Sequence, residues 1–274
     1  MPLRIPFWKL QSIGNDFPLV HLENLDVDLH KLAIAMADRR FGIGGDGLLA
    51  VEKTGENRVL LRMFNPDGTE DFCGNGLRIA AIHARTQGWV GDTFTIDHLG
   101  RPVPVQIDGE KVTTQLGSAT YNPAEVPLNG PELFKTTLPG GRFGSTLSTG
   151  TTHTIVWVDE LPGDEAFFAE SPVLETHETF PDRTSVMWTQ LIGPDHLKLR
   201  IWERGVGETQ GCGTGSTAAA VDYLRGENRP GRVQIDNPGG TVYVTWDPAT
   251  NVTSIEGTAQ LVYTGEYLPA TEIR

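Results

Sequence analysis

Short stretches in which hydrophobic and polar residues alternate recur along the chain. They are residues 58–65, 103–109, 111–117, 153–160, 196–203, 233–237 and 241–246. Alternation with a period of two predicts strands that bury one face. Apolar residues at helical spacing predict helices at 29–41, near 164–172, and directly after Cys73 and Cys212. The chain is therefore expected to have an α+β fold with more strand than helix.

Two longer passages repeat one another. They are "LRMFNPDGTEDFCGNGLRIAAIHARTQGW" at 61–89 and "LRIWERGVGETQGCGTGSTAAAVDYLRGE" at 199–227. Each runs from a strand through a glycine-containing turn to Cys-Gly-x-Gly and an alanine-rich helix. A pattern that occurs twice predicts two related halves rather than a solenoid, which needs at least three repeats. A boundary is expected near 116–132, which is rich in Pro, Asn and Gly.

Composition narrows the class of protein. The formal net charge is −13 over 274 residues, and no cluster of Lys and Arg is visible, so nucleic acid is not an expected partner. No apolar run approaches the roughly 18 residues of a membrane span, and the first residues lack the apolar core of a signal peptide. The expected location is the cytoplasm. The histidines and cysteines show no zinc-site spacing, so no metal is expected.

The two cysteines of the chain, Cys73 and Cys212, each open one copy of Cys-Gly-x-Gly. Glycines at a helix start expose backbone N–H groups that favour a carboxylate, and the same position makes a thiolate more available. Two such cradles could hold one carboxylate with a thiol on each side of the neighbouring carbon. One thiolate would remove a proton while the other thiol delivers one, which inverts the carbon. A redox pair and two structural cysteines are the alternatives.

With these residues in view, the chain resembles the diaminopimelate epimerase family over essentially its whole length. The matching stretches are "FWKLQSIGNDF", "DRRFGIGGDGLL", "RMFNPDGTEDFCGNGLR", "STGTTH", "SPVLETHETFPDRTSV" and "ERGVGETQGCGTG". The resemblance implies two pseudo-symmetric domains, each a mixed or antiparallel sheet wrapped around a central helix, with the active site in the interdomain cleft. It implies one half of residues 1–117 with 264–274, carrying Cys73, and another of residues 118–263, carrying Cys212.

The resemblance also implies roles for individual residues. Cys73 and Cys212 would be the two acid/base thiols of a cofactor-independent isomerase. The substrate-binding residues it implies are Asn15, Asn65, Gly74, Asn75, Thr151, His153, Ser185, Glu203, Arg204, Gly213 and Thr214.

Among these residues, the four that follow the cysteines would present N–H groups to the reacting carboxylate. Glu203 would lie near an ammonium group, Arg204 on a carboxylate and His153 beside the substrate amine. Simpler roles stay open: turn residues for Asn15 and Asn65, a surface ion pair for Arg204, and a structural role for His153. Asp46 is interpreted as a turn residue.

Two positions depart from the family pattern. Thr151 and Ser185 stand where the family usually has asparagines that bind the far, unreacting end of diaminopimelate. A hydroxyl has a shorter reach and different hydrogen-bonding capacity from an amide. The leading hypothesis is nevertheless the epimerisation of LL- to meso-diaminopimelate in lysine and cell-wall precursor biosynthesis. The alternative is a racemase of the same fold that acts on a different amino acid, for example histidine.

Other classes fit less well. Isomerases of the phenazine type share the implied fold but not the paired cysteines. Pyridoxal phosphate is not expected, because the lysines lie outside the motifs and no phosphate-binding loop is visible. The expected partner is a small-molecule amino acid, with no nucleic acid and no membrane. A homodimer and regulation by a Cys73–Cys212 disulfide are left open.

Overall fold

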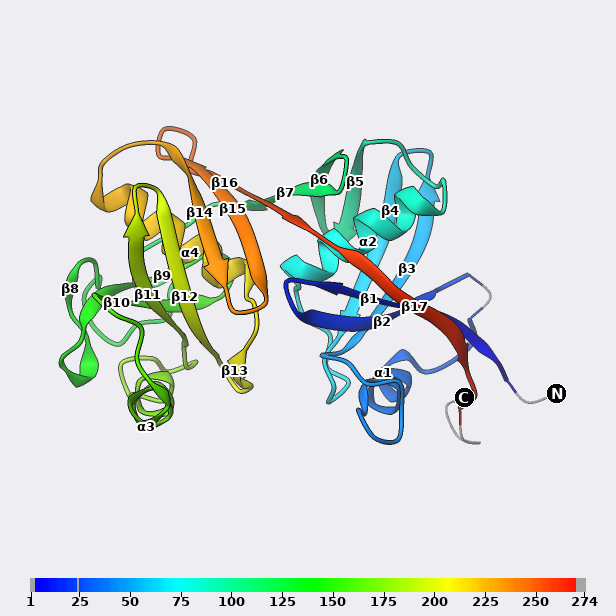
Figure 1. Ribbon diagram of the computed structural model, residues 1–274, viewed down its shortest axis with the longest axis horizontal. Helices are drawn as coiled ribbons and strands as arrows, with labels where there is room; N and C mark the ends of the chain where they lie inside the picture. The colour runs from blue at the N-terminus through cyan, green and yellow to red at the C-terminus, as the bar shows by residue number, and fades with distance from the viewer. Residues whose placement is uncertain (1–2, 24, 270–274) are drawn as a thin grey trace. The chain divides into compact units, whose positions relative to one another are not determined.

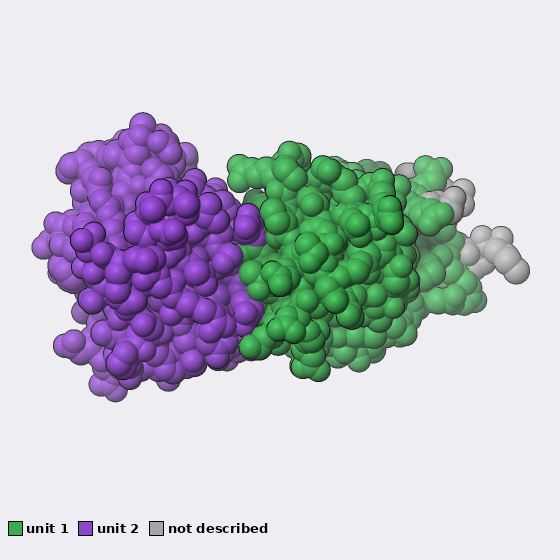
Figure 2. All heavy atoms as spheres, turned by 90° about the horizontal axis from the view of Figure 1, so that it is seen from above, with its two compact units in different colours: residues 1–114, 257–274 green, residues 115–256 purple. Residues whose placement is uncertain are grey.

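The computed structural model describes residues 3–23 and 25–269. The chain divides into two compact units (Figure 2). Unit 1 is Met1–Thr114 together with Gly257–Arg274, and unit 2 is Gln115–Glu256. Residues 270–274, which the sequence analysis assigned to the first half, lie outside the described residues.

Unit 1 is a mixed sheet wrapped around one helix (Figure 1). Its strands are β1 (Ile5–Ser12), β2 (Asn15–His21), β3 (Leu48–Gly55), β4 (Arg58–Phe64), β5 (Thr93–His98), β6 (Arg101–Asp108), β7 (Lys111–Gly117) and β17 (Gln260–Tyr267). They pair in the order β17-β1-β2-β3-β4-β5-β6-β7, with parallel pairing at β2–β3 and β4–β5 and antiparallel pairing elsewhere. The helix α2 (Gly74–Thr86) packs on strands from both ends of this order, and α1 (Leu29–Ala37) packs on β2, β3 and β4.

Unit 2 repeats this plan. Its strands are β8 (Thr136–Thr137), β9 (Phe143–Ser148), β10 (Thr152–Val158), β11 (Ser185–Gly193), β12 (His196–Glu203), β13 (Gly207–Thr209), β14 (Gly231–Asn237), β15 (Gly240–Asp247) and β16 (Val252–Thr258). From β9 to β16 the pairings are antiparallel, parallel, antiparallel, parallel, antiparallel and antiparallel, the same succession as from β1 to β7. The central helix is α4 (Gly213–Gly226), a short turn η1 (Pro139–Gly141) precedes β9, and α3 (Asp164–Glu175) corresponds to α1. The predicted α+β fold with two pseudo-symmetric halves is confirmed.

The central helices α2 and α4 contain many small residues that allow a sheet to pack around them. Most residues of α2 and α4 are buried, and many are alanine or glycine. Small side chains let a curved sheet approach a helix on several sides, which a chain of large residues would prevent. The strands supply the bulk instead, as in β6, where buried Val103, Val105 and Ile107 alternate with exposed residues.

The helix predicted at 29–41 is shorter than expected. It begins with Asp28, whose carboxylate accepts hydrogen bonds from the N–H groups of His30 and Lys31. It ends at Ala37, because Asp38 accepts from the N–H groups of Arg40 and Phe41 and starts a turn. Local bonding by an aspartate side chain thus outweighs the helical spacing that continues to Phe41. Within the described ranges, no helix is long and apolar enough to span a membrane.

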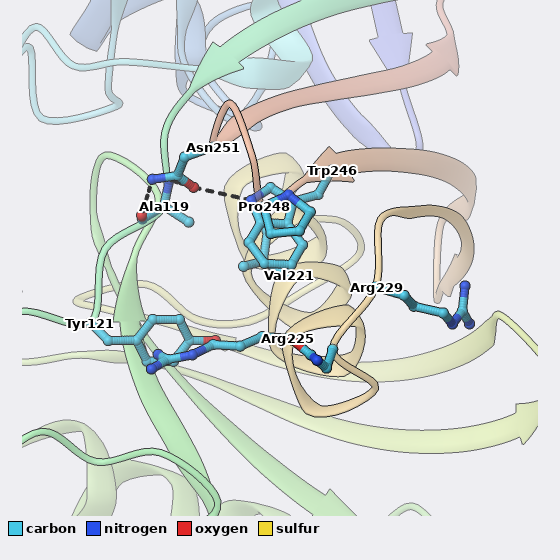
Figure 3. A pocket seen from close by; sticks show the side chains of 9 residues that line it. Ala119, Tyr121, Val221, Arg225, Arg229, Trp246, Pro248 and Asn251 are labelled. Carbon is cyan, nitrogen blue, oxygen red and sulfur yellow. Dashed lines mark hydrogen bonds between the residues drawn. The ribbon is translucent and has the colours of Figure 1, made fainter.

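An open pocket of about 330 Å³ lies in unit 2 at the C-terminal end of α4 (Figure 3). Its lining is Ala119, Tyr121, Val221, Arg225, Asn228, Arg229, Trp246, Pro248 and Asn251. The Asn251 side chain bonds Ala119 and Trp246, and both arginines pair with acidic residues. Because α4 has 14 residues and a helix rises about 1.5 Å per residue, the pocket is remote from the cysteine at the start of this helix.

A buried carboxylate anchors α4 in unit 2. Asp222 is fully buried and accepts hydrogen bonds from the hydroxyl of Tyr121 at 3.0 Å and from Nε1 of Trp157 at 2.7 Å. The ammonium of Lys135 lies 3.1 Å from the same carboxylate and 3.8 Å from the centre of the Trp157 ring. Three segments of unit 2, carrying Tyr121, Lys135 and Trp157, therefore contact the same residue of α4.

We predict that Asp222→Ala destabilises the protein by about 3–5 kcal/mol, because it leaves a half-buried ammonium and two donors without their acceptor. Denaturant unfolding measures this. The surface pair Arg58–Asp97 offers a matched control, because Asp97→Ala removes an acid from an exposed guanidinium and should cost about 1 kcal/mol or less. Equal losses in the two variants would contradict the anchoring role.

Candidate active site

Both cysteines occupy the N-cap position of a central helix. Cys73 precedes α2 and Cys212 precedes α4, and both have extended backbone angles, with φ of −133° and −122°. Each Sγ accepts a hydrogen bond from the N–H three residues later, from Gly76 at 3.2 Å and from Gly215 at 3.3 Å. An N-cap side chain normally supplies oxygen for this bond. Here sulfur takes that role, so the cap that starts each helix also holds the thiol in place.

The second glycine of each Cys-Gly-x-Gly lies where a side chain would be crowded, more so at Gly215 than at Gly76. A Cβ at Gly76 would lie 3.4 Å from the Cys73 sulfur and 3.0 Å from Leu49. A Cβ at Gly215 would lie 3.2 Å from the Cys212 sulfur and 2.5 Å from the sulfur of Met187. The glycines therefore let the sulfur approach the helix N-terminus, and at Gly215 a side chain would also displace the core beneath it.

The four residues predicted to present N–H groups are the first two of each helix. They are Gly74 and Asn75 in α2 and Gly213 and Thr214 in α4. The first N–H groups of a helix have no partner within the helix and carry the positive end of its dipole. Each cysteine thus stands beside a group of donors suited to a carboxylate.

The Cys73 cluster comprises Asn15, Asp46, Cys73 and Asn75. The amide of Asn75 donates to Oδ1 of Asn15 at 3.2 Å, and the Cys73 thiol lies 3.9 Å from the same oxygen. Nδ2 of Asn15 donates to Asp46 at 2.5 Å, which fixes the orientation of the amide. Asn15 therefore lies beside the thiol with its carbonyl oxygen directed toward it.

Asp46 does more than form a turn. Besides Asn15, its carboxylate accepts from the N–H of Asp16 and from the guanidinium of Arg39, both near 3 Å. Arg39 also pairs with Asp16, as does the buried Lys9. This network of two carboxylates and two cationic side chains holds the Asn15 amide through Asp46. The sequence analysis missed this network, because it interpreted Asp46, which stands among glycines in "GIGGDG", as a turn residue.

His98 is a second residue that the sequence analysis did not identify. Its Nε2 accepts a hydrogen bond from the N–H of Cys73 at 3.1 Å, so its proton is on Nδ1, which faces the carbonyl of Leu61 at 3.1 Å. Burial lowers the pKa of His98, which keeps the ring neutral. The neutral ring therefore holds the backbone of Cys73 in place and adds no positive charge beside the thiol. Nothing in the sequence near His98 signals this contact.

The Cys212 cluster comprises His153, Glu203, Cys212 and Thr214. Nε2 of His153 lies 4.0 Å from the sulfur of Cys212 and 3.2 Å from the hydroxyl of Thr214, which is itself 3.5 Å from the sulfur. Nδ1 of His153 lies 2.8 Å from the carbonyl of Thr151. A carbonyl can only accept, so Nδ1 carries the proton and Nε2 presents a lone pair toward the thiol.

The surroundings of Cys212 favour the neutral thiol. Burial raises the pKa of Cys212 well above its ordinary value, and the carboxylate of Glu203 adds to the rise. The hydroxyl of Thr214 and the N–H of Gly215 oppose it, with less effect. Burial lowers the pKa of His153 to about 4, so this ring is neutral at pH 7. At neutral pH Cys212 is therefore an uncharged thiol beside an uncharged histidine.

The strand register brings the other predicted residues of unit 2 together. His153 pairs with Ser185 across the parallel strands β10 and β11, and Val186 pairs with Trp202, so Ser185 lies next to the end of β12 at Glu203. Oγ of Ser185 accepts from the N–H of Arg204 at 3.1 Å, and Glu203 accepts from Thr209 at 2.6 Å.

The Arg204 guanidinium donates to the carbonyl of Asp182 at 3.0 Å, where the group is exposed. Asn65, directly after β4, is the position of unit 1 that matches Glu203 in the repeat. Its amide donates to the hydroxyl of Thr69 within its own turn, at 3.0 Å. Asn65 thus shares a sheet end with Asn15, while its amide bonds within its own turn. In the part of the chain that the structure describes, no group of three or more His, Cys, Asp or Glu residues could hold a metal ion.

Comparison with known proteins identifies the family. The family model described as "Diaminopimelate epimerase" matches residues 7–122 and 145–262. The diaminopimelate epimerase of Desulforudis audaxviator is 34% identical over 278 residues, covering 96% of this chain and 99% of that protein. That of a Synechococcus strain is 36% identical over 282 residues, with 97% and 99% coverage. A crystal structure of a hydroxyproline epimerase from Agrobacterium vitis shares the fold, with a TM-score of 0.68, 14% identity, and coverage of 96% and 90%.

We predict that Gly215→Ala costs about 1–3 kcal/mol of stability, because the new methyl group overlaps the sulfur of Met187. Gly76→Ala should cost less, since its closest contact is 3.0 Å. Gly91→Ala is the matched control, because a Cβ there meets nothing within 4 Å. Denaturant unfolding ranks the three variants. A Gly215→Ala protein as stable as the control would show that the core accommodates the methyl group.

The buried neutral His153 should make the protein less stable in acid. Its pKa is about 4 when folded and about 6.5 when unfolded, so only the unfolded chain binds the proton between these values. Stability should therefore fall from pH 6.5 to pH 4, with a contribution from this residue on the order of 3 kcal/mol. Unfolding of wild type and His153→Gln across this range measures the difference. Parallel curves for the two proteins would rule the effect out.

Proposed function

Because the chain belongs to the diaminopimelate epimerase family, a family of isomerases, we propose that it interconverts LL- and meso-diaminopimelate by inverting one α-carbon. Two side-chain thiols carry the proton transfers, so the chemistry requires no cofactor. The reaction belongs to lysine and cell-wall precursor biosynthesis.

One observation carries this proposal: a sulfur-capped helix N-terminus occurs once in each unit, in the same place in the same topology. Each copy combines a thiol with donors for a carboxylate. Racemisation needs an acid and a base on opposite faces of one carbon, and neither can replace the other. A structural cysteine pair or a redox pair would not need two separate carboxylate cradles.

The proton steps follow from these groups. The thiolate of one cysteine takes the α-proton and becomes a thiol, and the thiol of the other gives its proton to the opposite face and becomes a thiolate. The electron pair left by the C–H bond spreads into the substrate carboxylate. Helix N–H groups on that carboxylate stabilise the charge as it develops. The reverse reaction exchanges the roles of Cys73 and Cys212.

The remaining residues bind the substrate. We assign Glu203 to an ammonium group, Arg204 to a carboxylate, and Asn15, Asn65 and His153 to the polar groups around the reacting centre. Arg204 is suited to a carboxylate because its guanidinium offers two parallel donors. The neutral Nε2 of His153 is suited to an amine hydrogen.

Thr151 and Ser185 are assigned to the far end of diaminopimelate. Ser185 accepts from the N–H of Arg204 in this structure, and a hydroxyl that accepts can also donate. The carbonyl of Thr151 accepts from Nδ1 of His153, and the hydroxyl of Thr151 lies 3.5 Å from Nε2 of the same ring, which places it beside a group assigned to the substrate. Because the side chains of Thr151 and Ser185 are shorter than the usual asparagines, the sequence analysis kept a different amino-acid substrate as an alternative. The similarity to named diaminopimelate epimerases does not favour that alternative.

The setting proposed for the reaction is the cytoplasm, with a small amino acid as the partner. The net charge of −13 gives no basic surface for nucleic acid. A homodimer is the assembly to test first by sedimentation.

We predict that Cys73→Ser and Cys212→Ser each slow inversion of LL-diaminopimelate by roughly 10²–10⁴-fold, because a serine hydroxyl hardly ionises at neutral pH. The assay follows α-hydrogen exchange in deuterated water together with chiral analysis of the product. Thr86→Ser, a conservative change at the far end of α2, is the control and should keep full activity.

Near wild-type inversion by either serine variant would show that the two thiols do not form an acid/base pair. A panel of other amino acids tests the substrate separately. If wild type leaves diaminopimelate unchanged but inverts a different amino acid, the chemistry stands and the substrate assignment is wrong.

A further inference from the structure

The interior of unit 1 contains an unusual charge. Arg78, in the second turn of α2, is fully buried. Its Nε donates to the hydroxyl of Ser12 at 3.0 Å, and its Nη2 donates to the side-chain oxygen Oδ1 of Asn75. Among residues 3–23 and 25–269, its Nη1 has no hydrogen-bond partner. No carboxylate in the described residues forms an ion pair with it.

A buried guanidinium without an acid is costly. Buried arginines normally pair with a carboxylate, because desolvation of an uncompensated charge is strongly unfavourable. Burial lowers the pKa of Arg78 to about 10, which still leaves it charged at neutral pH. Methionine or leucine would fill the same volume without this cost. The charge therefore needs a function that a hydrophobic residue could not supply.

The contacts of Arg78 lead to the Cys73 cluster. Asn75, which accepts from Arg78, donates to Asn15, whose oxygen lies beside the Cys73 thiol. Attraction to an ionised Cys73 raises the pKa of Arg78 and so partly offsets its burial. The interaction between two charges is mutual, so the same attraction favours the ionised form of Cys73.

The other charges around Cys73 largely cancel. Asp16 and Asp46, from the β2 side, are paired with Lys9 and Arg39. From the β4 side, Glu70 is paired with Arg62.

Two groups remain beside the helix start. The side chain of Asp71 is exposed and accepts from the N–H of Phe72. His98, from β5, is kept neutral by burial, and its Nε2 accepts from the N–H of Cys73. Arg78 is thus the one buried charge near Cys73 that no described acid neutralises.

Unit 2 has no counterpart. The residue five positions after Cys212 is Thr217, as Arg78 is five positions after Cys73. Thr217 is buried and its hydroxyl donates to the carbonyl of Gly213 at 2.9 Å, within the helix. Cys212 instead has the carboxylate of Glu203 nearby, which acts against ionisation. The repeat thus preserves the thiols and glycines but reverses the electrostatic bias.

We propose that Arg78 is a positioning residue whose buried charge keeps Cys73 as the thiolate in the resting protein, while Cys212 rests as the thiol. Arg78 acts through Cys73 and does not itself touch the reacting atoms. This inference rests on the proposed function for its consequence: the substrate form whose α-hydrogen faces Cys73 reacts directly. After that turnover the proton is on Cys73 and Cys212 is ionised. One proton must leave Cys73 to solvent and another must return to Cys212 before the next.

Alkylation of the substrate-free protein tests the inference without any activity assay. Iodoacetamide is uncharged and reacts with thiolates, so the rate at each cysteine follows its ionised fraction as pH changes. Peptide mapping separates the two sites. In wild type the pH midpoint for Cys73 should lie below that for Cys212. Midpoints are compared rather than rates, because Cys212 is the more buried. A midpoint for Cys212 at or below that of Cys73 would overturn the proposal.

Substitution then assigns the bias to Arg78. Arg78→Met should raise the Cys73 midpoint by about one pH unit or more and leave Cys212 unchanged. Arg78→Lys, which keeps the charge, should stay near wild type. Arg85→Met is the matched control, because it removes a surface guanidinium from the last turn of the same helix. An unchanged Cys73 midpoint in folded Arg78→Met, or an equal shift in Arg85→Met, would refute the role.

If Arg78→Met does not fold, the wild-type midpoints and Arg78→Lys still decide the question. In active protein, Arg78→Met should also move the acid limb of the kcat/KM profile to higher pH, which a loss of packing alone would not do. If the alkylation midpoints contradict the expected order but the protein epimerises diaminopimelate, this inference is wrong and the proposed function stands. The opposite result would remove the proposed function and leave the electrostatic bias.

Discussion

A hydrogen bond between a backbone N–H and a cysteine sulfur recurs at the two positions on which the proposed chemistry depends. Helix N-termini have unpaired donors, and a side chain at the N-cap must satisfy one of them. In α2 and α4 that side chain is the thiol itself. The bond starts the helix and orients the sulfur beside the N-terminal end of the helix, whose dipole favours an anion. Glycine three residues later leaves room beside the sulfur, most clearly at Gly215, where a Cβ would lie 3.2 Å from it.

The fold surrounds each capped helix with a curved sheet, and this placement collects the rest of each cluster. In both units, candidate residues come from one end of three adjacent strands: Asn15, Asp46 and Asn65 in unit 1, and His153, Ser185 and Glu203 in unit 2. The parallel pairing of the first two strands sets their starts side by side, and the antiparallel third strand ends beside them. Since the central helix follows that third strand, its N-terminus begins at the same end.

The two clusters share geometry but differ in charge. Cys212 is buried near Glu203 and lies beside a neutral histidine. The Cys73 cluster is instead bonded through Asn75 to Arg78, a buried arginine with no carboxylate partner in the described part of the chain. After a duplication, topology and packing keep the two halves alike. The charges need not stay alike, because acid and base are different tasks. The electrostatic environment, rather than the thiol itself, distinguishes the roles proposed for them.

The sequence by itself determined the class of fold, the duplication and the positions of both thiols. Local patterns suffice for these: period-two strands such as β6 and β15, and Cys-Gly-x-Gly before alanine-rich stretches. The sequence did not predict that α1 ends at Ala37. The aspartate that ends this helix bonds N–H groups two and three residues ahead, while the apolar spacing continues. Tertiary structure decided which polar residues meet. Asp46 supports Asn15, His98 holds the backbone of Cys73, and Arg78 lies buried without an acid. Each of these depends on strand register or burial between residues distant in sequence, which no local pattern encodes.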